Sequence, residues 1–214
     1  GALLSWQNEI WPMQWRLGCS GLVNYFAFSL FNPVMFHYHG AVVAGRMGMT
    51  LQIVNGIQTV AMIWLKARVP AFGKMIAQRE YARLDRSWLK TAFLSLGSFI
   101  IMGSFFCLFL ALIQHWGMPF SERILPVASV GIFVAGGIFM NISQSLTAYL
   151  RAHKQEPIFI LGVTTSLLIG LLVWHLGRSF GPQGAAWGYL GVMIISVVWE
   201  TRIWQRCRRI WHAA

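Results

Sequence analysis

The sequence predicts an all-α integral membrane protein: a bundle of six transmembrane helices with a basic amphipathic helix on the cytoplasmic surface. Composition is the first observation behind this prediction, because the 214 residues are 57% hydrophobic and only 11% charged. A soluble domain carries about 25% charged residues, which argues against a soluble enzyme. Second, every Lys, Arg, Asp and Glu lies outside six long apolar runs. Third, Lys and Arg gather on alternate sides of those runs.

Each apolar run is about as long as a helix needs to cross a hydrocarbon core of ~30 Å. Lipid offers no hydrogen-bond partner to a bare peptide group, so each run is expected to be helical. Together the runs predict one six-span domain over residues 1–214. They cover residues 17–36, 47–65, 91–114, 124–150, 158–177 and 183–199.

The charges between the runs predict the orientation of the chain. Fourteen of the 17 Lys and Arg residues lie in one alternating set of segments, 1–16, 66–90, 151–157 and 200–214. Positively charged loops stay in the cytoplasm, so we expect a multi-pass protein with both termini cytoplasmic. The net charge of +11 then indicates contact with anionic lipid headgroups rather than with nucleic acid.

Residues 66–90 are too long and too regular for a simple loop. One stripe at helical spacing is apolar: Ala77, Tyr81, Leu84 and Trp88. A second stripe, two residues later, is basic: Arg79, Arg83, Arg86 and Lys90. Two residues are ~200° around a helix, so the stripes lie on opposite faces. They predict a helix on the inner membrane surface, which either docks an anionic lipid or lipid-linked substrate or anchors the topology.

Three runs carry polar side chains at helical spacing. The first run holds Asn24, Tyr25, Ser29 and Asn32, the second holds Gln52, Asn55 and Thr59, and the fourth holds Asn141, Gln144 and Ser145. Such stripes turn toward neighbouring helices or toward a water-filled cavity, because lipid cannot satisfy them. For the fourth run we favour packing between helices. For the first and second runs, packing and a cavity lining both stay open.

Other positions refine the individual spans. Pro33 removes a backbone hydrogen bond and is expected to bend the first helix near its outer end. Gly131 with Ala135, and Gly184 with Gly188, have the spacing at which membrane helices approach closely. The fifth run has few polar groups and is expected to be peripheral and lipid-facing.

The sequence shows no catalytic or metal-binding chemistry. It has no P-loop, no G-x-S-x-G elbow and no C-x-x-C pair. His37 and His39 have no third ligand nearby, so we expect no enzyme activity, no cofactor and no metal. No run contains a central charged residue, which argues against a proton relay. Glu9 and Glu200 lie at run ends and are interpreted as interfacial caps or as partners of nearby arginines.

Eight short segments carry a resemblance to a known family. They are residues 12–16 (PMQWR), 24–26 (NYF), 31–33 (FNP), 40–48 (GAVVAGRMG), 66–73 (KARVPAFG), 76–78 (IAQ), 84–85 (LD) and 180–188 (FGPQGAAWG). In order and spacing the chain resembles the polysaccharide flippases of the multidrug/oligosaccharidyl-lipid/polysaccharide exporter superfamily, which translocate O-antigen and other lipid-linked oligosaccharides. It looks like their C-terminal six-helix lobe. The resemblance implies a second lobe, in a missing N-terminal half or in another chain, and the start at Gly rather than Met fits a longer protein.

The resemblance implies flipping of a lipid-linked glycan across a bacterial inner membrane, in contact with membrane lipids. Its implied substrate cavity consists of Arg16, Asn24, Tyr25, Asn32, Arg46, Gln52, Asn55 and Thr59. The two arginines would attract a pyrophosphate, or would serve as rim anchors. One alternative is a multidrug or amphiphile exporter, which should show a carboxylate within a span. Another is a non-transporting membrane scaffold for glycan assembly.

Overall fold

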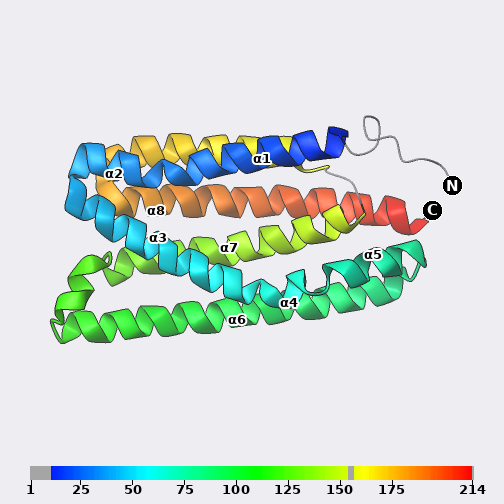
Figure 1. Cartoon of the computed structure of the whole chain (residues 1–214), viewed down its shortest axis with the longest axis horizontal. Coiled ribbons are helices and arrows are strands. Elements are labelled where there is room, and N and C mark those ends of the chain that lie inside the picture. The colour runs from blue at the N-terminus through cyan, green and yellow to red at the C-terminus, as the bar shows by residue number, and fades with distance from the viewer. Residues whose placement is uncertain (1–10, 154–156, 214) are drawn as a thin grey trace.

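The structure, a computed structural model, describes residues 11–153 and 157–213, so Glu9 lies outside the described residues. In this part of the chain the fold is all-α, and the helices run back and forth along one long axis (Figure 1). The elements are α1 (Trp11–Ser29), α2 (Phe31–His39), α3 (Ala41–Ala61), α4 (Ile63–Lys66), α5 (Val69–Ala77), α6 (Tyr81–His115), the 3-10 helix η2 (Pro119–Arg123), α7 (Val127–Ala152) and α8 (Phe159–Ala213).

Three helices of the described residues, α6, α7 and α8, are long and apolar enough to cross a membrane. α8 contains both the fifth and the sixth predicted runs, which meet at Gly181 with non-helical angles of φ 63° and ψ −150°. The first two runs lie in the shorter helices α1 to α4. The prediction of an all-α membrane bundle is therefore confirmed, whereas six separate spans are not clearly present.

The first predicted span is interrupted between α1 and α2, at the position where Pro33 is expected to disrupt a helix. α1 ends at Ser29 and α2 begins at Phe31, one turn before Pro33. A proline in a helix lacks the N–H for the carbonyl four residues earlier and crowds that carbonyl. Here that carbonyl belongs to Ser29, the last residue of α1.

Residues 66–90 do not form one surface helix. α5 ends at Ala77, and α6 begins at Tyr81 and continues unbroken to His115. The break includes Arg79, whose φ of 57° is a left-handed conformation that cannot continue a right-handed helix. The predicted separate helix is therefore wrong, because its second part is the first turns of α6.

The two stripes nevertheless face opposite ways in the first turns of α6. Leu84 and Trp88 are buried, and the Trp88 ring packs 5.2 Å from the ring of Tyr149 and 5.1 Å from that of Trp204. The basic stripe is exposed and consists of Arg79, Arg83, Arg86 and Lys90. Leu84 and Trp88 thus pack into the bundle, with Trp88 against α7 and α8, whereas Ala77 at the end of α5 is exposed.

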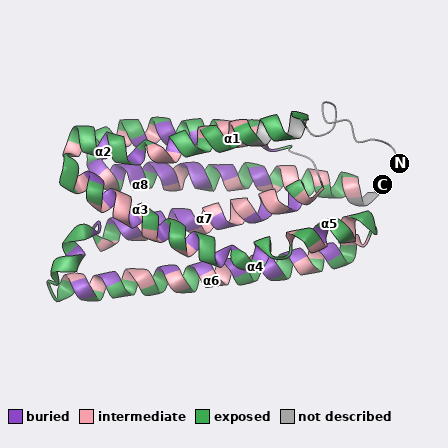
Figure 2. Cartoon of the chain, in the orientation of Figure 1, coloured by how far each residue is buried: buried purple, intermediate pink, exposed green. Residues whose placement is uncertain are grey.

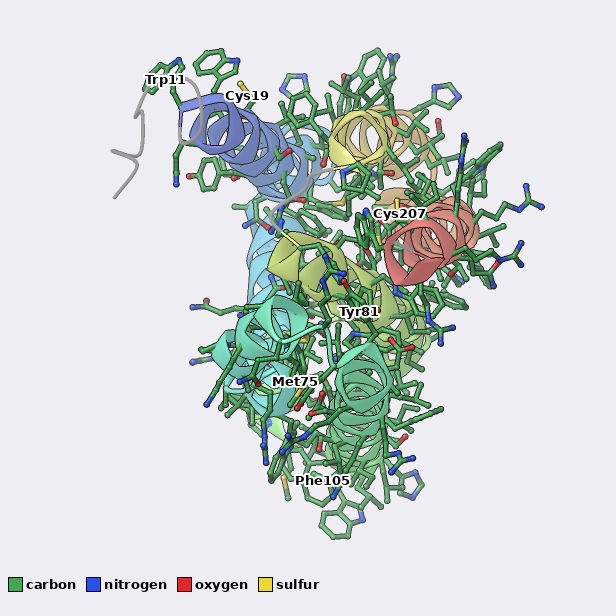
Figure 3. The ribbon with its side chains drawn as sticks, turned by 90° about the vertical axis from the view of Figure 1, so that its right-hand side faces the viewer. Trp11, Cys19, Met75, Tyr81, Phe105 and Cys207 are labelled. Atoms are coloured by element: carbon green, nitrogen blue, oxygen red, sulfur yellow. The ribbon has the colours of Figure 1, made fainter. Side chains whose placement is uncertain are left out.

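α7 and the second half of α8 lie at the centre of the bundle. Figure 2 shows buried residues concentrated on these helices, and Figure 3 shows α1 and α6 at opposite edges in the view along the bundle. Phe31, Phe133 and Tyr189 form the aromatic centre of the core, with ring centroids 5.9 to 6.3 Å apart. Aromatic side chains supply a large apolar area with specific edge-to-face geometry.

The outer surface is apolar, as a lipid-facing surface would be. Ile101 of α6 is 71% exposed, and Ile160 of α8 is 74% exposed. Soluble proteins rarely expose large contiguous apolar surfaces. The fifth run is not wholly lipid-facing, because Thr165 and Ser166 on its other side are buried.

Gly184 and Gly188 allow the two halves of α8 to pack closely, as their spacing predicts. A Cβ on Gly184 would meet the carbonyl oxygen of Leu176, and a Cβ on Gly188 would lie 3.2 Å from the Cβ of Leu172. The prediction for Gly131 is wrong, because a Cβ there would meet nothing within 4 Å.

Candidate functional site

The candidate site is a polar stripe on α3 that begins at a contact with α2. A Cβ on Gly48 would lie 3.2 Å from Nδ2 of Asn32, so the two helices meet at this point. Gln52, Asn55 and Thr59 follow Gly48 at i+4, i+7 and i+11, which places all four on one face of α3. The side chains of Gln52, Asn55 and Thr59 are exposed, and so is that of Asn32 on α2. We call Asn32, Gln52, Asn55 and Thr59 together the amide stripe.

Asn24 and Tyr25 lie apart from the amide stripe. Both are exposed, and both lie on α1. α1 and α3 come together at α2 and diverge toward the opposite end of the bundle (Figure 1). The structure therefore brings Asn32 to α3 but leaves Asn24 and Tyr25 along the diverging helix.

The hydrogen bonds of α3 separate its outer face from its inner face. On the inner face, the buried Gln58 donates from Nε2 to Oε1 of Gln144 on α7, at 3.3 Å. On the outer face, the Thr59 hydroxyl donates to the Asn55 carbonyl at 2.9 Å. Among the described residues, the side-chain amides of Gln52 and Asn55 have no hydrogen-bond partner. Their donors and acceptors remain available to water or to a solute.

The two arginines of the predicted cavity do not join the amide stripe. Arg46 precedes Asn55 by nine residues, which is about 180° around a helix at 3.6 residues per turn. It lies on the side of α3 away from the stripe, half-buried, and its Nε is buried without a partner. Arg16 lies in α1, and its side chain is outside the described part of the structure. In the described residues, therefore, the stripe carries amides and a hydroxyl but no charge.

The polar stripe of the fourth run is part of the interior. Asn141 is fully buried, and its Nδ2 donates to Oγ of Ser95 on α6 at 3.1 Å. Ser145 is also buried, and its carbonyl accepts a 2.9 Å hydrogen bond from Trp88 Nε1. This stripe bonds α6 to α7, which is the packing that the sequence favoured.

Two residues have contacts that the sequence did not predict. His39 was considered only as half of an H-x-H pair, but its Nε2 lies 2.7 Å from the carbonyl oxygen of Gly177, joining α2 to α8. Glu200 was interpreted as an interfacial cap or a partner of Arg202, which is wrong because Glu200 is only 5% exposed. Its carboxyl group accepts a hydrogen bond from Ser196 instead. The sequence offers one indication of this contact, because Ser196 lies four residues before Glu200 and therefore on the same face of the helix.

Comparison with known proteins gives a distant relation to a permease. The chain is 26% identical over 164 residues to the uracil permease of Escherichia coli (strain K12), and equally to that of Escherichia coli O157:H7. The match covers 72% of this chain and 35% of each relative, so the chain spans about a third of the length of the curated relatives it matches. No family model matches the chain, and no solved structure matches it.

These relatives overturn the resemblance to polysaccharide flippases. The similarity found lies with a permease named for uracil, not with a translocator of lipid-linked glycans. Most of the eight segments that suggested flippases are rich in Gly, Pro and aromatic residues, which are frequent in membrane helices and at membrane–water interfaces. Such segments are therefore poor discriminators between families of membrane proteins.

Proposed function

We propose that this chain is part of a membrane transporter for a small, uncharged polar solute and that the amide stripe lines the path of this solute. The observation that carries the proposal is the exposure of the Gln52 and Asn55 amides, which have no hydrogen-bond partner among the described residues, one turn apart on the same face of α3. The distant similarity to uracil permease supports transport as the activity.

An amide stripe of this kind is unfavourable against lipid. An amide moved into a medium without hydrogen-bond partners costs about 4–8 kcal/mol. Gln52, Asn55 and Thr59 therefore face water or another polar protein surface. The chain spans 35% of its relatives, so we propose that a second helical body, from the rest of a longer chain or from another chain, faces the stripe across a wet path.

The membrane arrangement that we propose uses all six apolar runs. The α1–α2 and α3–α4 pairs serve as the first two spans, α6 and α7 as the next two, and the halves of α8 as the last two. The basic segments then lie on one side, which we assign to the cytoplasm of a bacterial inner membrane. There the basic stripe Arg79, Arg83, Arg86 and Lys90 contacts anionic lipid headgroups.

The chemistry of the stripe favours a neutral solute with both donors and acceptors at its edge. Asn and Gln each offer an amide carbonyl and an NH₂ group, which pair with N–H and C=O groups of a cyclic amide. Uracil presents such an edge. A charged solute would require an opposite charge on the stripe, and Arg46 points to another side of α3. We therefore infer a nucleobase-like solute.

Cysteine labelling in membranes tests both the path and the solute. In a background with Cys19, Cys107 and Cys207 replaced by Ala, Gln52→Cys and Asn55→Cys should react with a water-soluble, membrane-impermeant thiol reagent in vesicles opened to both sides. Ile101→Cys is the lipid-facing control and should stay inert. Arg83→Cys is the water-exposed control and should react.

Uracil added before the reagent should lower labelling at residues 52 and 55 severalfold without changing it at residue 83. If residues 52 and 55 are as inert as residue 101, the path is wrong. If they react but uracil does not protect them, the path stands and the nucleobase-like solute is wrong. Uptake of radiolabelled uracil by cells expressing the full-length gene then tests transport itself.

A further inference from the structure

Glu200 lies in the interior of the bundle, near the end at which α8 finishes. Its side chain is held between the two halves of α8. The Ser196 hydroxyl, one turn earlier, donates to Glu200 Oε1 at 3.1 Å. Thr165, from the first half of α8, lies 3.0 Å from the Ser196 hydroxyl. All three residues are less than 10% exposed. A chain of hydroxyl groups from one half of α8 therefore ends on a buried carboxyl group of the other half.

The second oxygen of this carboxyl group is unpaired. Glu200 Oε2 is buried and has no hydrogen-bond partner. The hydroxyl of Ser143 faces the same carboxyl group from α7 but closes no hydrogen bond to Oε2. The polar groups that face Glu200 are thus the hydroxyls of Ser143 from α7 and Ser196 from the second half of α8. The Thr165 hydroxyl, from the first half of α8, contacts Ser196 behind them.

No cation neutralises the carboxyl group among the described residues. None of their Lys, Arg or His side chains forms an ion pair with Glu200. Arg202, two residues later, is exposed, and its guanidinium lies over the Trp199 ring, 5.4 Å from the centroid. An isolated carboxylate buried away from water is very costly, and such groups neutralise by taking up a proton.

We propose that Glu200 is a proton-binding site, in which the carboxyl group buried between α7 and the two halves of α8 holds a proton. Protonation adds H⁺ to a carboxylate oxygen and leaves a neutral acid, and deprotonation returns H⁺ to water. A link between this proton and solute movement rests on the proposed function, whereas proton binding itself does not. The site is separate from the amide stripe of α3.

The groups around Glu200 suit a proton better than a divalent metal ion. Ca²⁺ takes about 6–8 oxygen ligands and Mg²⁺ demands near-ideal octahedral geometry. The described residues bring one carboxyl and three hydroxyl groups, and two of the hydroxyls already lie at hydrogen-bond distance from each other. A single carboxyl oxygen without a partner can be satisfied by one covalently bound hydrogen.

Infrared spectroscopy of the purified full chain tests proton binding directly. The chain has only six Asp and Glu residues, so few carboxyl signals overlap. At neutral pH and without solute, the spectrum should contain the C=O band of one protonated carboxyl group. The band should be lost completely in Glu200→Gln and retained in Glu122→Gln, which changes an exposed carboxyl group in η2.

A band that persists in Glu200→Gln, or no band in the unmodified chain, overturns the proposal. Loss of the band on adding Na⁺ also overturns it, because the site would then bind a metal cation in place of the proton. If Glu200→Gln does not fold, Ser196→Ala tests the assignment of the band instead. Removing the donor to Oε1 should shift the frequency of the band. An unshifted band would contradict its assignment to Glu200. None of these readouts depends on the cysteine labelling of the amide stripe.

Discussion

Asp85 near the start of α6 and Arg208 near the end of α8 form an ion pair between residues 123 positions apart. Nε of Arg208 donates to Oδ2 of Asp85 at 2.9 Å. The Tyr149 hydroxyl of α7 donates to the other carboxylate oxygen at 2.7 Å. The Asp85 carboxylate therefore joins three helices at the end of the bundle that carries the basic segments. The Asp85 side chain is 20% exposed and that of Arg208 is 44% exposed, so solvent screens the pair in part.

Asp85→Asn should destabilise the bundle, because it removes the charge that both donors contact. A hydrogen bond to a charged group contributes about 1.5–3 kcal/mol, and we expect a loss of about 2 kcal/mol in the free energy of unfolding. Arg208→Gln should lower the free energy of unfolding less in the Asp85→Asn background than in the original chain. A double-mutant cycle in mixed detergent micelles measures this coupling, expected at about 0.5–3 kcal/mol.

The matched control for this cycle is the exposed pair of Arg83 and Glu80. Their side chains are 71% and 40% exposed, with Nη1 and Oε2 3.0 Å apart. Exposed pairs of this kind contribute about 0.2–1 kcal/mol, so Arg83→Gln should change stability little. Strictly additive effects of the Asp85 and Arg208 substitutions would show that their pairing does not contribute to stability.

The helices were predictable from the sequence, but their ends and breaks were less so. Apolar runs predicted helical segments because a peptide in lipid must bond to itself, and the break before Pro33 follows from a local rule. The left-handed Arg79 that divides residues 66–90 carries no such signal, since a non-Gly residue with positive φ is uncommon. The buried Leu84 and Trp88 continue directly into the third run, which makes the basic segment part of α6.

The candidate site was predictable to a similar degree. Spacing alone placed Gln52, Asn55 and Thr59 on one face of a helix. The same spacing places Arg46 about 180° from Asn55. Arg46 was nevertheless included in the predicted cavity because of the resemblance to polysaccharide flippases. The burial of Glu200 could not be derived, because it depends on the packing of α7, which brings the Ser143 hydroxyl to the carboxyl group from 57 positions earlier in the sequence.

Close packing at Gly136 gives a second stability prediction. A Cβ on Gly136 of α7 would collide with the Tyr189 ring of α8, and Tyr189 belongs to the aromatic core. Overpacking a well-packed core costs about 1–3 kcal/mol, so Gly136→Ala should lower the free energy of unfolding by that amount. Thermal unfolding in detergent, followed by circular dichroism, measures the change.

Gly131→Ala is the natural comparison for Gly136→Ala. It lies on the same helix five residues earlier, and a Cβ there meets no atom within 4 Å. Alanine is favoured over glycine in a helix by about 0.8–1.0 kcal/mol, so this variant should be as stable as the original chain or more stable. Equal destabilisation by both variants would mean that α7 and α8 do not pack as described.

The turn between the two halves of α8 gives the last prediction. Gly181 has φ 63° and ψ −150°, a combination that is essentially restricted to glycine. A Cβ there would lie 3.6 Å from the His39 ring, so space is available and the backbone alone opposes a side chain. Gly181→Ala should therefore cost about 1–3 kcal/mol. His39→Ala, which removes only the hydrogen bond to Gly177, should cost about 1 kcal/mol. Limited proteolysis should then cut the Gly181→Ala turn faster than the His39→Ala turn, and equal cleavage rates would contradict a turn set by the backbone of Gly181.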